Sequence, residues 1–268
     1  PRSRTLRAVR PIAALEAEEA RSLLGLLFDL DDTLLTRGEL TEAAYAALFR
    51  LRESGLRLVA TTGRPAGWGE VLAAQWPVDV VVTENGAIAL TRAGRRVERL
   101  DAVAGEERRR RRRAVARLVK EIHARWPELE LADDAAARTS DLTLDVGERR
   151  VVRPEAVAAA AAFAHAQGAR THRSSIHLHV THDDVDKASG TLRAVHRILN
   201  VEPAVARERF AFIGDSDNDS SCFAAFRTTI AVANLTGHAT VPPRYLTAQP
   251  MGAGFVEAAV VIVARRGE

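Results

Sequence analysis

The stretch Phe28-Asp29-Leu30-Asp31-Asp32-Thr33-Leu34-Leu35 decides how the chain is organised. Before it runs an apolar segment, residues 23–28, whose length is typical of a buried strand in a parallel sheet. Asp29 and Asp31 therefore stand at the carboxyl end of a strand, where open α/β sheets bind their ligands. Two ionised carboxylates this close repel each other, so the sequence predicts a hard divalent cation beside them. A strand end followed by a simple Asx turn is the alternative interpretation.

Apolar strands and amphipathic helices alternate on the C-terminal side of this stretch. A helix is predicted over residues 41–52, with Thr41 as its N-cap. Strands are predicted at residues 56–60 and 78–82, the first ending at Thr62. This β-α-β-α-β order predicts a doubly wound, Rossmann-like parallel sheet, so the expected fold class of the core is α/β.

A different pattern fills the middle of the chain. A hairpin (residues 87–100) and a long helix (105–125) come first, and the strands at 139–146 and 175–181 then alternate apolar and polar side chains. Such alternation indicates an antiparallel sheet with one open face. We therefore expect an inserted α+β cap. The expected segments are a first part of the core at 1–90, the cap at 91–181 and a second part of the core at 182–268.

The composition excludes several classes of protein. Of 268 residues 47% are apolar, yet no apolar run approaches the length that spans a bilayer. The basic N-terminus lacks the apolar centre of a secretory signal, and the single cysteine, Cys222, fits a reducing compartment. We therefore expect a cytoplasmic protein without a membrane partner. No feature of the sequence bears on its oligomeric state.

The basic residues are strongly biased towards arginine. Lysine and arginine together number 38, but only Lys120 and Lys187 are lysines. Because the two side chains are not interchangeable, Lys187 is a candidate for a site that needs a compact ammonium group. Residues 108–113 are six consecutive arginines, which would wrap around a helix without forming one basic face. A solvated helix is the preferred interpretation, and nucleic-acid binding through this run is a remaining hypothesis.

A second acidic cluster, Gly214-Asp215-Ser216-Asp217-Asn218-Asp219, follows the strand predicted at residues 209–213. A calcium loop is excluded, because Ser220 and Phe226 stand where that loop needs glycine and glutamate. Asp215 is instead predicted to share one Mg²⁺ with the carboxylates of the first stretch.

These residues resemble the four motifs of the haloacid dehalogenase superfamily of phosphotransferases. Asp29-x-Asp31-x-Thr33 matches the first motif, Thr62 the second, Lys187 the third, and Gly214-Asp215-x-x-x-Asp219 the fourth. Thr62-Gly63-Arg64, Glu84-Asn85-Gly86 and the place of the insertion resemble the type IIB cap branch, which includes Cof-like and sucrose-phosphate phosphatase-like proteins. The resemblance spans about residues 23–260.

The resemblance implies a role for each matched residue. Asp29 is the implied nucleophile that forms an aspartyl-phosphate, and Asp31 the implied acid and base. Thr62 and Lys187 would stabilise the transferring phosphoryl oxygens. Mg²⁺ would be bound by the Asp29 carboxylate, the Asp31 carbonyl and Asp215, with Asp219 in the same metal set. Supporting positions around the crevice are Asn218, Gly63, Arg64 and Asn85, with Asn234 at its rim.

We expect the polar face of the predicted cap sheet to bind and recognise the substrate. Strand parity places five side chains on that face: Asp141, Asp145, Ser175, His177 and His179. A merely solvated face is the alternative, and a zinc site at His177 and His179 lacks an obvious third ligand. We expect a Mg²⁺-dependent phosphatase of a small phosphorylated metabolite, preferably a sugar phosphate. A phosphomutase on the same scaffold is the alternative function.

Overall fold

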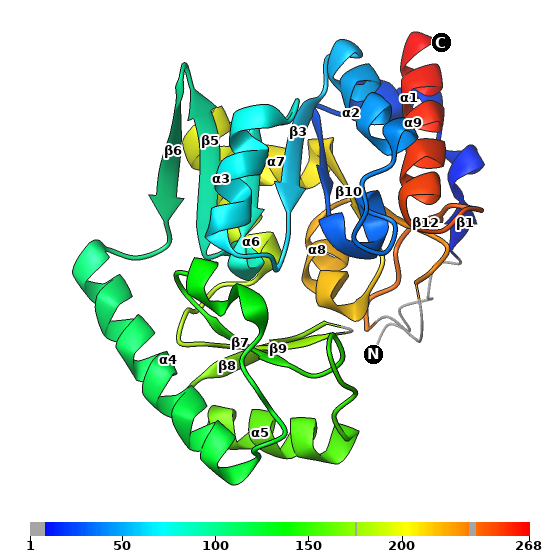
Figure 1. The fold of residues 1–268 in the computed structure, drawn as a ribbon. Coiled ribbons are helices and arrows are strands. Elements are labelled where there is room, and N and C mark those ends of the chain that lie inside the picture. Colours follow the sequence, from blue (N-terminus) through cyan, green and yellow to red (C-terminus); the bar gives the residue numbers. More distant parts are fainter. Residues whose placement is uncertain (1–8, 175, 236–239) are drawn as a thin grey trace, which may run out of the picture.

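The computed structural model describes residues 9–174, 176–235 and 240–268, in which nine strands form one large sheet (Figure 1). In spatial order they are β1 (Arg10–Pro11), β12 (Tyr245–Leu246), β11 (Thr228–Ala231), β10 (Phe210–Gly214), β2 (Gly25–Phe28), β3 (Arg57–Thr61), β4 (Val80–Thr83), β5 (Ile88–Ala93) and β6 (Arg96–Asp101). Neighbours from β1 to β4 run parallel, whereas β5 and β6 are antiparallel additions beside β4. The α/β core predicted from the sequence is confirmed.

Helices cover both faces of the large sheet. One face carries α1 (Ala17–Ser22), α2 (Glu42–Glu53), α3 (Ala66–Gln75) and α9 (Met251–Gly267), and the other carries α6 (Lys187–Leu199), α7 (Pro203–Arg209) and α8 (Ser220–Ala225). Within β2, Leu26 and Phe28 belong to the buried cluster on the first face and Leu27 to that on the second. A strand buried on both faces needs an unbroken apolar run, which explains the pattern that precedes Asp29.

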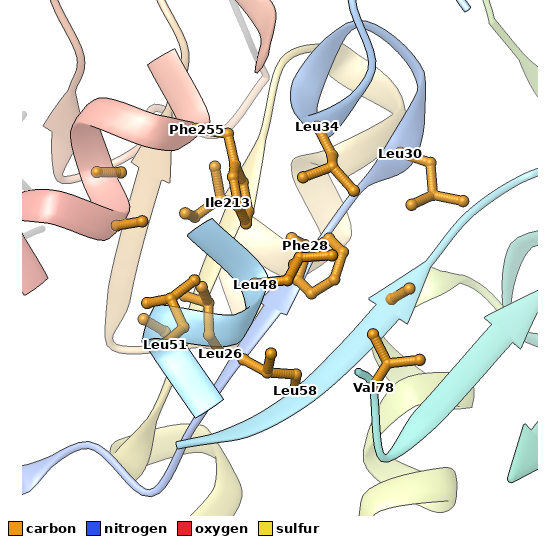
Figure 2. Packing of buried hydrophobic residues seen from close by; sticks show 14 of the residues in the cluster. Leu26, Phe28, Leu30, Leu34, Leu48, Leu51, Leu58, Val78, Ile213 and Phe255 are labelled. Carbon is orange, nitrogen blue, oxygen red and sulfur yellow. The ribbon is translucent and has the colours of Figure 1, made fainter. Parts of the chain in front are cut away.

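Packing around β2 fixes the strand from which the site projects. Figure 2 shows Leu26 and Phe28 beside Leu48 of α2 and Phe255 of α9. The rings of Phe28 and Phe255 meet edge to face with their centroids 5.3 Å apart. Helix α2 begins as predicted, because the Thr41 side chain accepts a hydrogen bond from a backbone N–H of the first turn.

A second, smaller layer follows β6. It contains α4 (Gly105–Arg125), a short helix (Asp133–Ala137), β7 (Leu142–Asp145), α5 (Pro154–Ala166), β8 (Arg170–Arg173) and β9 (His177–Thr181). The strands form an antiparallel sheet in the order β7-β9-β8. Leu144, Leu178 and Val180 pack with α4 and α5 in a separate buried cluster, so the polar face of this sheet turns towards the large sheet (Figure 1).

The hairpin expected to open the insertion belongs to the large sheet. β5 pairs with β4, and β6 pairs with β5 through residue 101. The physical reason is burial, because residues 88–90 are fully covered: Ile88 and Leu90 extend the core cluster next to α3, and Ala89 extends the cluster on the opposite face. The expected boundary at residue 91 thus falls inside β5, and the smaller layer begins with α4. As a division into domains, the segments 1–90, 91–181 and 182–268 stay a prediction.

Other differences concern short elements. β1 and β12 contain two residues each, too few for a periodic pattern, and they were not predicted. Before β2, the chain forms a short turn at Ile12–Ala14 and then α1. Among the helices that the structure describes, none combines the length and apolar character needed to cross a membrane.

The Gly86–Gly190 contact gives a test of the packing between α6 and the large sheet. A methyl group on Gly190 would lie 2.2 Å from Gly86 Cα, where only backbone is present to move. We expect Gly190→Ala to lower the free energy of unfolding by about 1–3 kcal/mol through overpacking. Denaturant titration would measure this loss. Gly105→Ala is the control, since its methyl would meet only an arginine side chain at 3.8 Å, and equal midpoints for both variants would contradict the expectation.

Candidate active site

Three strand ends bring the predicted catalytic residues to one edge of the large sheet. Asp29 follows β2, Thr62 follows β3 and Asp215 follows β10. β2 lies between β3 and β10, and the chain leaves it towards β3 on one side and returns to β10 on the other. Such a switch in strand order opens a crevice at the carboxyl ends of the strands. Lys187, the first residue of α6, reaches the same crevice.

Asp29 lies at the bottom of this crevice. Its side chain is nearly buried, and its Oδ1 lies 3.0 Å from Lys187 Nζ. The backbone then turns sharply, because Asp32 has a φ of 54°, in the left-handed region that aspartate tolerates better than most residues. This turn leaves the side chain of Asp31 about half exposed, at 49%. One acid is therefore sheltered and the other open to ligands.

Lys187 is held by two carboxylates. Its Nζ lies 2.7 Å from Asp219 Oδ1, and both side chains are almost completely buried. Burial alone would lower the pKa of Lys187, but Asp219 and Asp29 outweigh it and hold the pKa above the ordinary value. The ammonium group therefore stays charged next to Asp29. A compact cation held in this way is suited to binding phosphoryl oxygens.

Asp219 has both carboxylate oxygens engaged. While Oδ1 binds Lys187, Oδ2 accepts the backbone N–H groups of Asp215 and Ser216 at 2.9 and 3.2 Å. The residue thus fixes the turn after β10 and the lysine together. A direct metal-ligand role for Asp219, implied by the resemblance, stays a prediction.

Asp215 combines burial with nearby negative charge. Its oxygens accept hydrogen bonds from Thr33 Oγ1 at 3.2 Å and Asn234 Nδ2 at 3.4 Å. Burial and then repulsion from Asp219 raise the pKa of Asp215 to about 7. Burial also raises the pKa of Asp29, and Lys187 opposes only part of that rise. The negative charge of Asp29 and Asp215 is therefore only partly compensated by Lys187.

These carboxylates fit a hard cation. Oxygen atoms from Asp29, Asp215 and Asp219 all lie within 4.8 Å of one another, the one such cluster of acid, histidine or cysteine ligands among residues 9–174, 176–235 and 240–268. An all-oxygen donor set suits Mg²⁺ or a similar ion. The raised pKa values of Asp29 and Asp215 support this fit independently, because a bound cation would relieve the same repulsion.

Arg64 has a more specific position than the crevice rim expected from the sequence. Its guanidinium binds Asp31 through both Nε and Nη2, at 2.6–3.1 Å. The same group stacks over the Trp68 ring, with 4.2 Å between Cζ and the ring centroid. Arg64 therefore fixes the direction of the predicted acid and base.

Thr62, Gly63 and Asn85 form the wall between β3 and β4. Thr62 is buried, and its Oγ1 accepts the Arg64 N–H at 3.1 Å, which leaves its own hydroxyl proton free to donate. Asn85 Oδ1 accepts a hydrogen bond from Asn218 Nδ2 at 3.3 Å. Asn85 Nδ2 is buried beside Gly63 and has no acceptor within the described parts of the chain. Such an amide is a ready donor for a ligand oxygen.

The predicted cap residues separate into two groups. Asp141 Oδ2 lies 2.8 Å from His179 Nδ1, and the His179 ring approaches Gly63 in the loop after β3. Asp145 instead accepts three backbone N–H groups of the following turn, and His177 pairs with exposed Glu148 at 2.9 Å. Ser175 lies outside the described residues. The zinc site considered for His177 and His179 gains no third ligand from this arrangement.

A cavity of about 280 Å³ adjoins Lys187 between the two sheets. Its lining was only partly expected, because three of its residues come from β8. The lining residues are Thr171, His172, Arg173, Asp186, Lys187, Asp217, Asn218 and Ser221. Burial lowers the pKa of His172 to about 4, so its imidazole is neutral at neutral pH. A strand is expected from the sequence at residues 169–173 and corresponds to β8, but its side chains are polar on both faces, so no pattern indicated which of them would line a cavity.

The arginine run does not form a basic face. Arg108 is buried and binds Asp101, with its Nη1 2.7 Å from Asp183. Arg112 bonds to backbone carbonyl groups, including that of Asp141. The exposed members pair with glutamates on the same helix: Arg109 and Arg113 with Glu106, and Arg110 with Glu107. These contacts support the preferred interpretation over nucleic-acid binding.

Comparison with known proteins agrees with this architecture. Residues 26–101 match the family model of haloacid dehalogenase-like hydrolases. No curated protein matches the sequence.

Solved structures share the fold at low sequence identity. A protein from Thermoplasma acidophilum has a TM-score of 0.73 at 17% identity, covering 90% of this chain and 98% of its own. A phosphatase of the haloalkanoate superfamily from Bacteroides thetaiotaomicron has a TM-score of 0.62 at 18% identity, with 91% and 96% covered. The C-terminal domain of C. albicans trehalose-6-phosphate phosphatase has a TM-score of 0.66 at 14% identity, with 96% and 98% covered. Residues 26–101 thus carry the signature of haloacid dehalogenase-like hydrolases, and solved structures share the fold of the chain over about nine tenths of its length.

Proposed function

We propose that this hydrolase is a Mg²⁺-dependent phosphatase that acts on a small phosphorylated metabolite through an aspartyl-phosphate. The observation that carries the proposal is the buried pair of Asp29 and Lys187, 3.0 Å apart at the switch point of the sheet. At this distance both groups can act on the same phosphoryl group: the carboxylate oxygen can contact the phosphorus atom, and the ammonium group can contact the phosphoryl oxygens. Thr62 adds a hydroxyl donor from the neighbouring strand end.

The proposed reaction has two balanced steps. An Asp29 oxygen forms a bond to phosphorus while the bond to the substrate's alkoxy oxygen breaks, and Asp31 transfers a proton to that oxygen. Asp31 then takes a proton from water, whose oxygen attacks phosphorus and releases inorganic phosphate and free Asp29. Lys187 and Thr62 stabilise the equatorial oxygens in both steps.

Asp29 and Asp215, with the Asp31 backbone carbonyl, are the proposed Mg²⁺ ligands. The ion when bound would neutralise charge on the carboxylates and on the phosphoryl oxygens. Thr33 and Asn234 hold Asp215 by hydrogen bonds, which orients it for this role.

The cavity next to Lys187 supports a small, neutral polyol as the alcohol part of the substrate. Hydroxyl, amide, imidazole and carboxylate groups line it, and such groups bind sugar hydroxyls. Apart from Lys187, its charged lining residues are Asp186, Asp217 and Arg173. Two carboxylates and one guanidinium are a poor receptor for a second phosphate, which a phosphomutase must hold. The lining therefore favours the phosphatase over the mutase.

Replacing the nucleophile tests the chemistry directly. We expect Asp29→Asn to reduce Mg²⁺-dependent phosphate release by about a thousandfold or more, because the amide cannot form the acyl phosphate. A colorimetric phosphate assay measures the loss. Asp32→Asn is the matched control, because asparagine also tolerates the left-handed turn and Asp32 is not assigned to the chemistry. Activity that survives in Asp29→Asn, or in wild type with excess chelator, would rule out the mechanism.

A substrate comparison separates the phosphatase from the mutase. We expect free inorganic phosphate from sugar monophosphates, with lower kcat/KM for the corresponding bisphosphates because of Asp186 and Asp217. Phosphorus-31 NMR would follow both substrates and products. An isomeric sugar phosphate formed only with a bisphosphate activator would instead establish the mutase.

The raised pKa of Asp215, about 7, predicts that Mg²⁺ competes with a proton. Because the ion binds the carboxylate, binding should release about half a proton from Asp215 at pH 7. Affinity should weaken by about tenfold for each pH unit below about 6, as protonation becomes complete. Calorimetry in two buffers with different ionisation enthalpies measures both effects. A Mg²⁺ affinity that is constant between pH 5.5 and 8 would contradict the assignment.

A further inference from the structure

Glu84 connects the large sheet to the smaller layer. It follows β4, yet its carboxylate accepts hydrogen bonds from the loop that precedes β7. The donors are the backbone N–H groups of Thr139 at 2.8 Å and Ser140 at 2.5 Å, and the Ser140 hydroxyl at 2.7 Å. Glu84 is 3% exposed, and the described groups that act on its carboxylate are hydrogen-bond donors and the like charge of Asp141, not a basic side chain. The hydrogen bonds that compensate for the loss of water around the Glu84 carboxylate therefore come mostly from the smaller layer.

Arg138 makes the reverse connection. Its Nη1 donates to the Gly63 carbonyl oxygen at 3.0 Å, from the smaller layer to the loop after β3. Asp134 and Asp141 hold the same guanidinium at 2.7–3.1 Å. The group is thus buried and fully oriented before it reaches Gly63.

The catalytic loop after β3 lies between these two contacts. The Glu84 N–H donates to the Arg64 carbonyl at 3.0 Å, and Glu84 Oε1 accepts the Ala66 N–H at 2.9 Å. The next residue, Asn85, donates its N–H to the Thr62 carbonyl at 3.2 Å. Every hydrogen bond in this set ends on the segment that carries Thr62 and Arg64.

The backbone at Glu84 and Asn85 is strained. Their φ values are 50° and 52°, so two consecutive residues other than glycine adopt the left-handed region. Such conformations persist where the surroundings hold them, and they concentrate at functional sites. Here the loop contacts and the smaller layer supply those constraints.

From this geometry we infer that Glu84 and Arg138 are positioning residues, which fix Thr62 and the Arg64–Asp31 pair by docking the smaller layer onto the catalytic loop. The inference rests on the proposed function. It implies that the docked layer is needed for turnover of a substrate too small to contact it. Residues that only recognise the substrate's alcohol would have no such effect.

Kinetics with p-nitrophenyl phosphate test this inference. We expect Glu84→Gln and Arg138→Met each to lower kcat by at least about tenfold, because sub-ångström errors in positioning are costly, while KM changes less than about threefold. Arg138→Lys, which keeps a donor for Gly63, should recover part of kcat. Glu148→Gln is the matched control, because Glu148 lies in the same layer but pairs only with His177. Circular dichroism confirms the fold of each variant.

Hydrogen exchange of the full-length variants provides a readout independent of activity. We expect amides of residues 62–66 to lose protection in Glu84→Gln and Arg138→Met but not in Glu148→Gln. Unchanged kcat on p-nitrophenyl phosphate, or unchanged protection of this segment, would overturn the inference. If wild type releases no phosphate at all, the proposed function fails, and the exchange result still decides whether the smaller layer holds the loop.

Discussion

Repulsion between buried carboxylates is the constraint on which the rest of the site depends. Asp29, Asp215 and Asp219 converge within 4.8 Å, and Lys187 lies 2.7 and 3.0 Å from two of them. The lysine ammonium is a compact point charge with three donors, whereas the guanidinium of arginine is planar and larger, so arginine would not fit the same position between the carboxylates. In a chain that uses arginine almost everywhere else, this explains why a lysine stands at this position. The scaffold must hold that lysine firmly, since an unpaired buried carboxylate is costly.

Local structure around α6 meets that requirement. Asp186 caps the helix by accepting the Ser189 N–H at 2.8 Å, and the Ser189 hydroxyl accepts the Asp186 N–H at 2.9 Å. This capping box places Lys187 in the first turn, where the helix dipole adds positive potential to its own charge. The close approach of Gly190 to Gly86 brings the same turn against the loop after β4. The capping box, the glycine contact and the ion pairs therefore all fix the position of Lys187.

The core site was predictable because strand ends are visible in sequence. Apolar runs end at Asp29, Thr62 and Asp215, and topology brings such ends together. The smaller layer was less predictable. Strand parity puts Asp141, Asp145, His177 and His179 on one face of the smaller sheet, but alternation does not show which end of a strand meets the crevice. Glu84 and Arg138 were missed because their partners lie 55 and 75 residues away in the chain, and isolated hydrogen bonds to backbone leave no periodic pattern.

Arg108 has one more consequence for the chain as a whole. It binds Asp101 at the end of β6 and Asp183 just before α6, so it ties together the two points where the chain leaves and re-enters the large sheet. Arg108 lies in the first turn of α4, so one of the first residues of the inserted segment holds the two ends of that segment together. Changes of length after α4 that spare Arg138 and Ser140 would therefore leave this junction and the contacts with the loop after β3 intact. The inserted segment is thus held to the large sheet in two separate places, by Arg108 at its two ends and by Glu84 and Arg138 at the loop after β3.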